Sequence, residues 1–302
     1  MQEALKRAAS RFIDLRGMRH HVLEWGEPGA PLVVMLHGWM DVGASFQFLV
    51  DALDGPWHVV APDLRGFGRS EWQPQGYWFW DYVADLDALL TCLSPDAPVR
   101  LVGHSLGGNV AMHYAGARPA RVRALVSLEG FGIPFEQAQI APRKMTAWLD
   151  ALRDPPVFRP YDDLGAVADR LQKNNPRLTR AKAEFLAAHW ARVTNDGRAT
   201  LVSDPRHKLP YPTVYRMEDT FAIWRAITAP VLWVAAAQSH IPRWLDTHPE
   251  GEMGADGLGG VRQRLKEVPG AALALIDDAG HMLHHDQPHA VARAIEPFLR
   301  SR

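Results

Sequence analysis

The five residues Gly103-His104-Ser105-Leu106-Gly107 constrain the fold of this chain more than any other feature. The apolar run at 99–102 before them is typical of a buried strand, and the pattern after them is typical of a helix. A serine between glycines at such a junction indicates a tight, strained turn that exposes the hydroxyl beyond the end of the strand. The sequence therefore predicts a nucleophile, Ser105, at the carboxyl edge of a sheet.

Further short apolar runs alternate with helical patterns, which predicts a mostly parallel sheet covered by helices on both faces. Residues 12–15 and 20–25 alternate like a hairpin at the start of that sheet. Helical patterns lie at about 79–93, 106–117 and 286–300. Continuous apolar runs, typical of strands buried on both faces, lie at 31–36, 57–61, 99–102, 122–128, 230–236 and 272–276.

The segment 131–226 differs from the rest because it contains no convincing strand. Its amphipathic patterns predict helices near 143–152, 164–173 and 179–193, separated by proline-containing turns. We expect 131–226 to form a helical cap, inserted into a core made of 1–130 and 227–302. The glycine-rich stretch 251–260 is the best candidate for a mobile surface loop.

The composition is that of an ordinary globular protein, with 47% hydrophobic and 22% charged residues. The formal net charge of -1 gives no electrostatic reason to expect nucleic acid or an anionic membrane as a partner. The first residues lack the apolar core of a signal peptide, and no run approaches the roughly 18 apolar residues of a membrane helix. A single cysteine excludes an intrachain disulfide. We therefore expect a cytoplasmic protein that acts on a small molecule.

A serine hydroxyl is a weak nucleophile until a base takes its proton. His281 follows the last apolar run after a short loop, which places it on the same edge of the sheet as Ser105. The rival bases are His284 and His285, which the pattern places at the start of the last helix. We predict that His281 is the base.

Acyl transfer also needs two donors for the oxyanion that forms on the substrate. The backbone N–H of Leu106, directly after the nucleophile, is the first candidate. The turn His37-Gly38 after the run at 31–36 aims the second candidate, the backbone N–H of Trp39.

The chain contains HGW at 37–39, DLRGFGRS at 63–70, GHSLGG at 103–108 and AGHMLHHDQP at 279–288. Together these four motifs resemble the α/β-hydrolase superfamily. The resemblance covers nearly the whole chain, and HGWMDVGASF and LVSLEGFG are similar to the serine hydrolase-like esterase group within it. It implies an α/β-hydrolase fold with an eight-stranded sheet, and acyl-enzyme chemistry without a cofactor. The cap matches weakly, so the resemblance does not identify the acyl group.

The carboxylate that would orient His281 departs from the superfamily pattern. Most members place an aspartate after the strand expected at 230–236, where this chain has Ser239. Some members place the acid after the preceding core strand, and here that strand ends in Glu129. We predict a Glu129 carboxylate about 2.6–3.2 Å from His281 Nδ1. Three alternatives are an ordinary loop role for Glu129, Asp246 as the acid, and Asp278, which lies too near His281 in sequence.

Aromatic residues in the cap and the loops predict an apolar pocket for an uncharged substrate. Without a charged pair that would clamp a carboxylate, we expect esters of small to medium apolar acyl groups. The candidate substrate contacts are Trp39, His104, Trp148, Trp190 and Met282.

Other activities remain open on the same three residues: thioesterase, aminopeptidase, C–C bond hydrolase and perhydrolase. A catalytically silent binding module is also open because the usual acid is absent. A metal site built from the histidines at 281–285 and Asp286 is the rival outside this class. Its spacing does not match a helical zinc motif, so we expect no metal and no cofactor.

Overall fold

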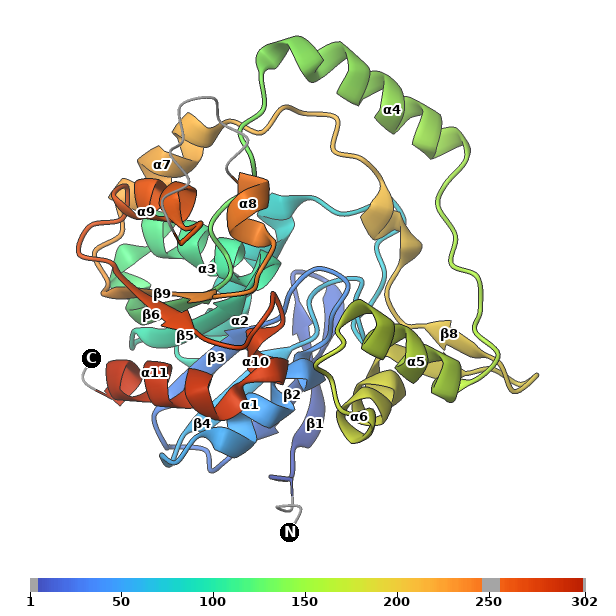
Figure 1. Ribbon diagram of the computed structural model, residues 1–302, viewed down its shortest axis with the longest axis horizontal. Coiled ribbons are helices and arrows are strands. Elements are labelled where there is room, and N and C mark those ends of the chain that lie inside the picture. The colour runs from blue at the N-terminus through green and yellow to red at the C-terminus, as the bar shows by residue number, and fades with distance from the viewer. Residues whose placement is uncertain (1–4, 246–255, 301–302) are drawn as a thin grey trace.

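The computed structural model describes residues 5–245 and 256–300 of the chain. Its centre is an eight-stranded sheet in the order β1-β2-β4-β3-β5-β6-β9-β10 (Figure 1). β2 pairs antiparallel with β1 and with β4, and the other neighbouring strands are parallel, which confirms the predicted sheet. The strands are β1 (Ala9–Leu15), β2 (Met18–Trp25), β3 (Leu32–Leu36), β4 (His58–Pro62), β5 (Val99–His104), β6 (Val122–Leu128), β9 (Val231–Ala236) and β10 (Ala272–Ile276).

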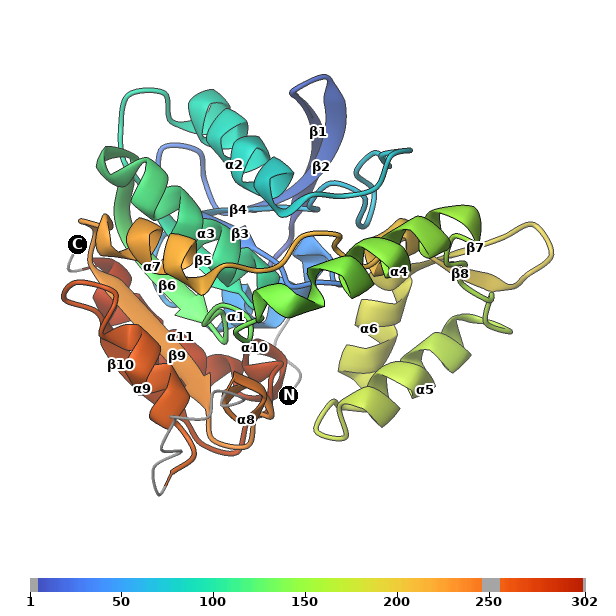
Figure 2. The ribbon, with the colours of Figure 1, turned by 90° about the horizontal axis from the view of Figure 1, so that it is seen from above.

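The central strands are apolar along their length because helices cover both of their faces. Every residue of β9 is buried, whereas only Ile276 is buried on the edge strand β10. One hydrophobic cluster joins the sheet to α2 (Phe79–Leu93), α3 (Leu106–Ala117) and α7 (Met217–Arg225). A second cluster joins the opposite face to α1 (Gln47–Ala52) and α11 (Pro288–Arg300), so the sheet lies between two helical layers (Figure 2).

Three short helices follow the last two strands or connect them. They are α8 (Ile241–Leu245), α9 (Gly259–Leu265) and α10 (Leu283–Asp286). The glycine-rich stretch predicted at 251–260 ends in α9, and its residues 251–255 lie outside the described residues. Within the described chain, no helix is long and apolar enough to cross a membrane.

The segment expected to form the cap carries α4 (Ala141–Arg153), α5 (Leu164–Asn174) and α6 (Arg180–Trp190). α5 and α6 share a small hydrophobic cluster of their own. α4 arches away from the rest of the molecule and contains no buried residue (Figure 1). α7, the last helix of the expected segment, packs closely against α3 of the core. A Cβ atom at Gly116 of α3 would lie 2.1 Å from the Ile223 carbonyl oxygen of α7. The cap boundaries of 131 and 226 stay a prediction.

The prediction that this segment contains no strand is wrong. α6 ends at Trp190, and the next residues form β7 (Ala191–Val193), which pairs antiparallel with β8 (Ala199–Leu201). Between the two strands, the amide of Thr194 donates to the Arg198 carbonyl, and Gly197 has a φ of 81°. Two strands of three residues are too short to produce the alternation that marks a strand in sequence.

Candidate active site

Ser105 occupies a strained turn between β5 and α3. Its φ is 51° and its ψ is -112°, a conformation that costs a non-glycine residue about 1–3 kcal/mol. The flanking glycines make this turn sterically possible. A Cβ atom at Gly103 would lie 2.3 Å from the Gly107 carbonyl oxygen, and one at Gly107 would lie 2.1 Å from the Leu36 carbonyl oxygen. Close packing therefore requires glycine at positions 103 and 107, and the turn between them holds the Ser105 hydroxyl at the edge of the sheet.

His281 lies in the loop after β10, with its ring between Ser105 and Glu129. Its Nε2 is 3.1 Å from Ser105 Oγ, and its Nδ1 is 3.3 Å from Glu129 Oε2. The second distance is just beyond the upper end of the predicted range. If Nδ1 carries the proton toward the carboxylate, Nε2 is left as the acceptor for the serine proton. The three side chains thus form one continuous chain of polar contacts.

Glu129 is 2% exposed and directly follows β6 with a φ of 58°. Its Oε1 accepts a hydrogen bond of 2.8 Å from the amide of Ala236, the last residue of β9. Its Oε2 accepts a hydrogen bond from the hydroxyl of Ser239, the residue that stands where most of the superfamily has its acid. These donors hold the carboxylate in one orientation against His281.

The other carboxylates considered from the sequence lie elsewhere. Asp278 is exposed, and its carboxylate is 3.8 Å from the guanidinium of Arg177. Asp246 lies outside the described residues. Within the described part of the chain, the hydrogen-bond partner of His281 Nδ1 is the carboxylate of Glu129.

The loop after β3 runs directly against Ser105. A Cβ atom at Gly38 would lie 3.4 Å from Ser105 Cβ and 2.8 Å from His104 Nδ1, so only glycine fits there without displacement. His37 holds the loop from inside: its Nε2 accepts from the Leu64 amide at 2.9 Å, so its Nδ1–H donates to the Gly38 carbonyl at 2.7 Å. Burial lowers the pKa of His37 to about 4, which keeps the ring neutral and this tautomer fixed.

This loop carries the Trp39 amide, and α3 begins with the Leu106 amide on the other side of Ser105. The first amides of a helix have no acceptor within the helix and are free to bind an anion. Both predicted oxyanion donors therefore belong to segments that flank the serine.

The rival histidines are buried behind His281. His284 and His285 are 0% and 3% exposed, and they lie in α10, a separate helix just before α11. His104 is 1% exposed, and its Nε2 donates to the His281 carbonyl oxygen at 2.8 Å. The structure thus places His104, a predicted substrate contact, in the interior beneath His281.

The remaining predicted substrate contacts are distributed around the site. Trp39 is 52% exposed, and Met282 is half-buried beside His281. Trp148 is half-buried on α4, and Trp190 closes α6 with its indole N–H donating to Asp41 Oδ1 at 3.0 Å. These roles stay predictions. A cavity of about 610 Å³ lies between the core and α6, lined in part by Val42, Asp63, Arg69, Trp72 and His189, and its lining does not include Ser105.

Sequence reasoning missed Asp41, two residues after Trp39. It is 2% exposed, and its Oδ1 also accepts from the Val42 amide at 2.9 Å and from the Ser45 hydroxyl. Burial raises the pKa of this carboxyl to about 7. An aspartate in a loop gives no sequence signal of burial, because loop carboxylates are usually exposed.

The chain resembles known hydrolases over most of its length. The family model for the alpha/beta hydrolase fold matches residues 31–288. The serine hydrolase-like protein of Danio rerio is 27% identical over 98% of this chain and 90% of its own length. Lipase LipV of Mycobacterium tuberculosis is 31% identical over 93% of this chain and 98% of its own. The solved thioesterase domain from the curacin biosynthetic pathway superimposes with a TM-score of 0.80 at 25% identity, covering 96% of this chain and 99% of that domain.

Proposed function

This chain belongs to the α/β-hydrolase family, and from that membership we propose that it is a serine hydrolase that cleaves carboxylic esters of small to medium apolar acyl groups. The observation that carries the proposal is the chain of contacts from Ser105 Oγ through His281 to Glu129. A nucleophile, a base and an acid in this order are what acyl transfer through a covalent intermediate requires.

In the proposed first half-reaction, His281 Nε2 takes the Ser105 proton as Oγ attacks the ester carbonyl. The negative charge that develops on the carbonyl oxygen is bound by the amides of Trp39 and Leu106. Glu129 stabilises the imidazolium through Nδ1–H. His281 then protonates the leaving alcohol, and the acyl group remains on Ser105.

In the second half-reaction, water takes the place of the alcohol. His281 removes a proton from the water, which attacks the acyl-enzyme, and the same two amides bind the second oxyanion. Protonation of Ser105 Oγ by His281 releases the carboxylic acid. No step needs a cofactor.

The preference for uncharged acyl groups rests on the side chains near the nucleophile. Trp39 and Met282 follow Gly38 and His281 directly in sequence, so large apolar side chains adjoin two segments that flank Ser105. The similarity to a lipase supports an ester substrate. The similarity to a thioesterase domain favours thioesters as the second candidate, since only the leaving group differs.

The experiment is a panel of p-nitrophenyl esters from acetate upward, assayed beside acyl thioesters of the same chain lengths. We expect kcat/KM to be highest on uncharged esters and turnover to vanish in Ser105→Ala. A fluorophosphonate probe should label wild type and not Ser105→Ala. A folded wild-type protein that neither hydrolyses any member of the panel nor reacts with the probe would be a binding module, and the proposal would fail.

A further inference from the structure

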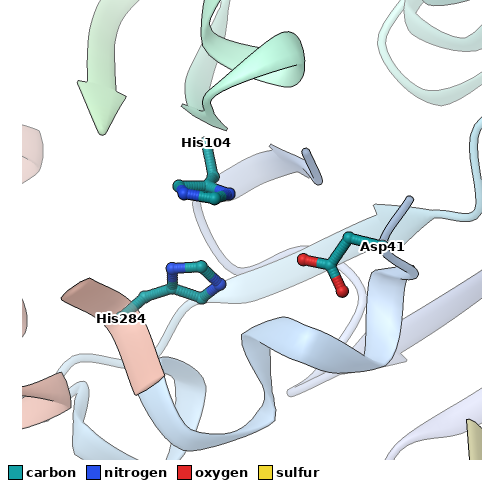
Figure 3. A group of neighbouring side chains, drawn as sticks. All are labelled: Asp41, His104 and His284. Carbon is teal, nitrogen blue, oxygen red and sulfur yellow. The ribbon is translucent and has the colours of Figure 1, made fainter. Parts of the chain in front are cut away.

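Three buried side chains from distant parts of the sequence meet behind the candidate active site. They are Asp41 from the loop after β3, His104 from the end of β5 and His284 from α10 (Figure 3). Each is at most 2% exposed. One carboxylate oxygen and one nitrogen from each ring all lie within 4.8 Å of one another. The cluster is distinct from the metal site considered from the sequence, with which it shares only His284.

The cluster contains polar atoms that have no hydrogen-bond partner among the described residues. These atoms are Asp41 Oδ2, His104 Nδ1 and both ring nitrogens of His284. An unsatisfied buried polar atom destabilises the fold, so native proteins rarely leave several together. One such atom from each of the three side chains lies within 4.8 Å of the other two, which points to a ligand that they share.

The hydrogen bonds around the cluster fix which atoms are available. His104 Nε2 donates its hydrogen to the His281 carbonyl, so Nδ1 carries the lone pair and faces the interior. Asp41 Oδ1 is occupied by its three donors, which leaves Oδ2 without a partner among the described residues. Figure 3 shows one oxygen of this carboxylate turned toward the rings.

We propose that Asp41, His104 and His284 bind one divalent transition-metal ion of the Zn²⁺ type. Two imidazole nitrogens and one carboxylate oxygen are a donor set that Zn²⁺, Co²⁺ and Ni²⁺ accept, whereas Mg²⁺ prefers oxygen ligands. Ligands about 2.0–2.2 Å from Zn²⁺ are at most about 4.4 Å apart, so small ring rotations bring the three atoms into range. The ion would also neutralise the buried carboxylate.

The position of this site gives it a structural role that does not depend on the proposed esterase activity. His104 precedes the strained Ser105 and supports the backbone of His281, while Asp41 follows the Trp39 turn and holds Trp190 of α6. An ion held by all three ligands would link these segments. We therefore expect binding to raise the melting temperature.

The test measures metal content and uses Zn²⁺ itself as the probe. The protein is produced in Zn²⁺-supplemented medium, because a buried site fills most readily during folding. After gel filtration, the metal content per chain is measured by elemental mass spectrometry. We expect about one Zn²⁺ per wild-type chain and an occupancy at least about tenfold lower in His284→Phe and Asp41→Asn. His285→Phe is the matched control: it removes the neighbouring buried ring of α10 and should keep the ion.

Circular dichroism establishes that each variant is folded. Replacing Zn²⁺ by Co²⁺ in the wild-type protein provides a second readout, the visible spectrum of the bound ion. This spectrum distinguishes nitrogen and oxygen ligands at a low coordination number from a six-coordinate aqueous ion and from a thiolate ligand. The proposal is overturned if wild-type protein retains no stoichiometric metal or gives a six-coordinate or thiolate Co²⁺ spectrum. It is equally overturned if folded His284→Phe binds as much Zn²⁺ as wild type, or if His285→Phe alone loses it.

Discussion

Replacing Glu129 by glutamine tests the proposed acid without changing its shape. Glu129 Oε1 must remain an acceptor for the Ala236 amide. The glutamine oxygen takes that position, and its NH₂ group then faces His281 Nδ1. Two donors cannot face each other, so Nδ1 must give up its hydrogen and Nε2 must carry it. In that tautomer His281 cannot accept the Ser105 proton.

The size of the effect follows from the geometry. A carboxylate 3.3 Å from the imidazolium stabilises it by about 5 kcal/mol at an effective dielectric constant of about 20. Because about 1.4 kcal/mol corresponds to a factor of ten in rate, this energy corresponds to a loss of about three to four orders of magnitude. We therefore expect Glu129→Gln to lower kcat by ~10³–10⁴ with little change in KM.

The assay is steady-state hydrolysis of the best p-nitrophenyl ester, with circular dichroism to show that the variant is folded. Ser239→Ala is the matched control, because it removes only a donor to Oε2, and we expect it to lower kcat by less than about tenfold. Adding Ser239→Asp to Glu129→Gln should recover part of the loss, since it returns a carboxylate beside the same position. Folded Glu129→Gln with kcat within about tenfold of wild type, or an equal loss in Asp246→Asn, would refute the assignment.

Three further predictions concern the nucleophile, the pocket and a buried ion pair. Ser105→Ala should lower esterase turnover by about four to six orders of magnitude in a folded protein, and residual activity within about tenfold would contradict the nucleophile. Dicarboxylate monoesters should give a lower kcat/KM than uncharged esters of equal length, and equal values would contradict an apolar pocket. Although burial alone would raise the pKa of Asp85, hydrogen bonds with His20 and Arg65 lower it from 3.8 to about 2. The ionised Asp85 carboxylate therefore stabilises the fold above pH 4, and this contribution is lost as the pH falls through about 2. We expect Asp85→Asn to lower the free energy of unfolding by about 2 kcal/mol or more at pH 7 and by less at pH 3, as measured by urea unfolding.

The sequence predicts the core better than it predicts what covers the core. The helices expected at 79–93 and 106–117 have those bounds in the structure, because each buries a continuous apolar face against the sheet. α1, α8 and α10 are too short for a helical period to be visible, and β7 and β8 are too short for alternation.

The same contrast holds within the candidate site. Ser105, Glu129 and His281 each follow a parallel strand, so the topology alone brings them to one edge. The inward direction of His104 and the burial of Asp41 depend on how loops and α10 pack, which no local pattern encodes. The cluster with His284 joins residues 41, 104 and 284, and its members become neighbours only in the folded chain.

The register of the sheet explains how an acid after β6, as proposed for Glu129, and an acid after β9 would reach the same place in space. β6 and β9 are neighbours, with Leu128 opposite Val234, so the residues that follow the two strands emerge side by side. The Glu129 amide donates to the Val234 carbonyl at 3.0 Å, and the Ser239 hydroxyl reaches Glu129 Oε2. An acid on either loop therefore approaches the same face of His281. The left-handed backbone at Glu129, with its φ of 58°, turns the side chain back over the end of β9, and the Ala236 amide receives it there. The longer glutamate side chain suits the strand that is farther from β10, where the loop of His281 begins.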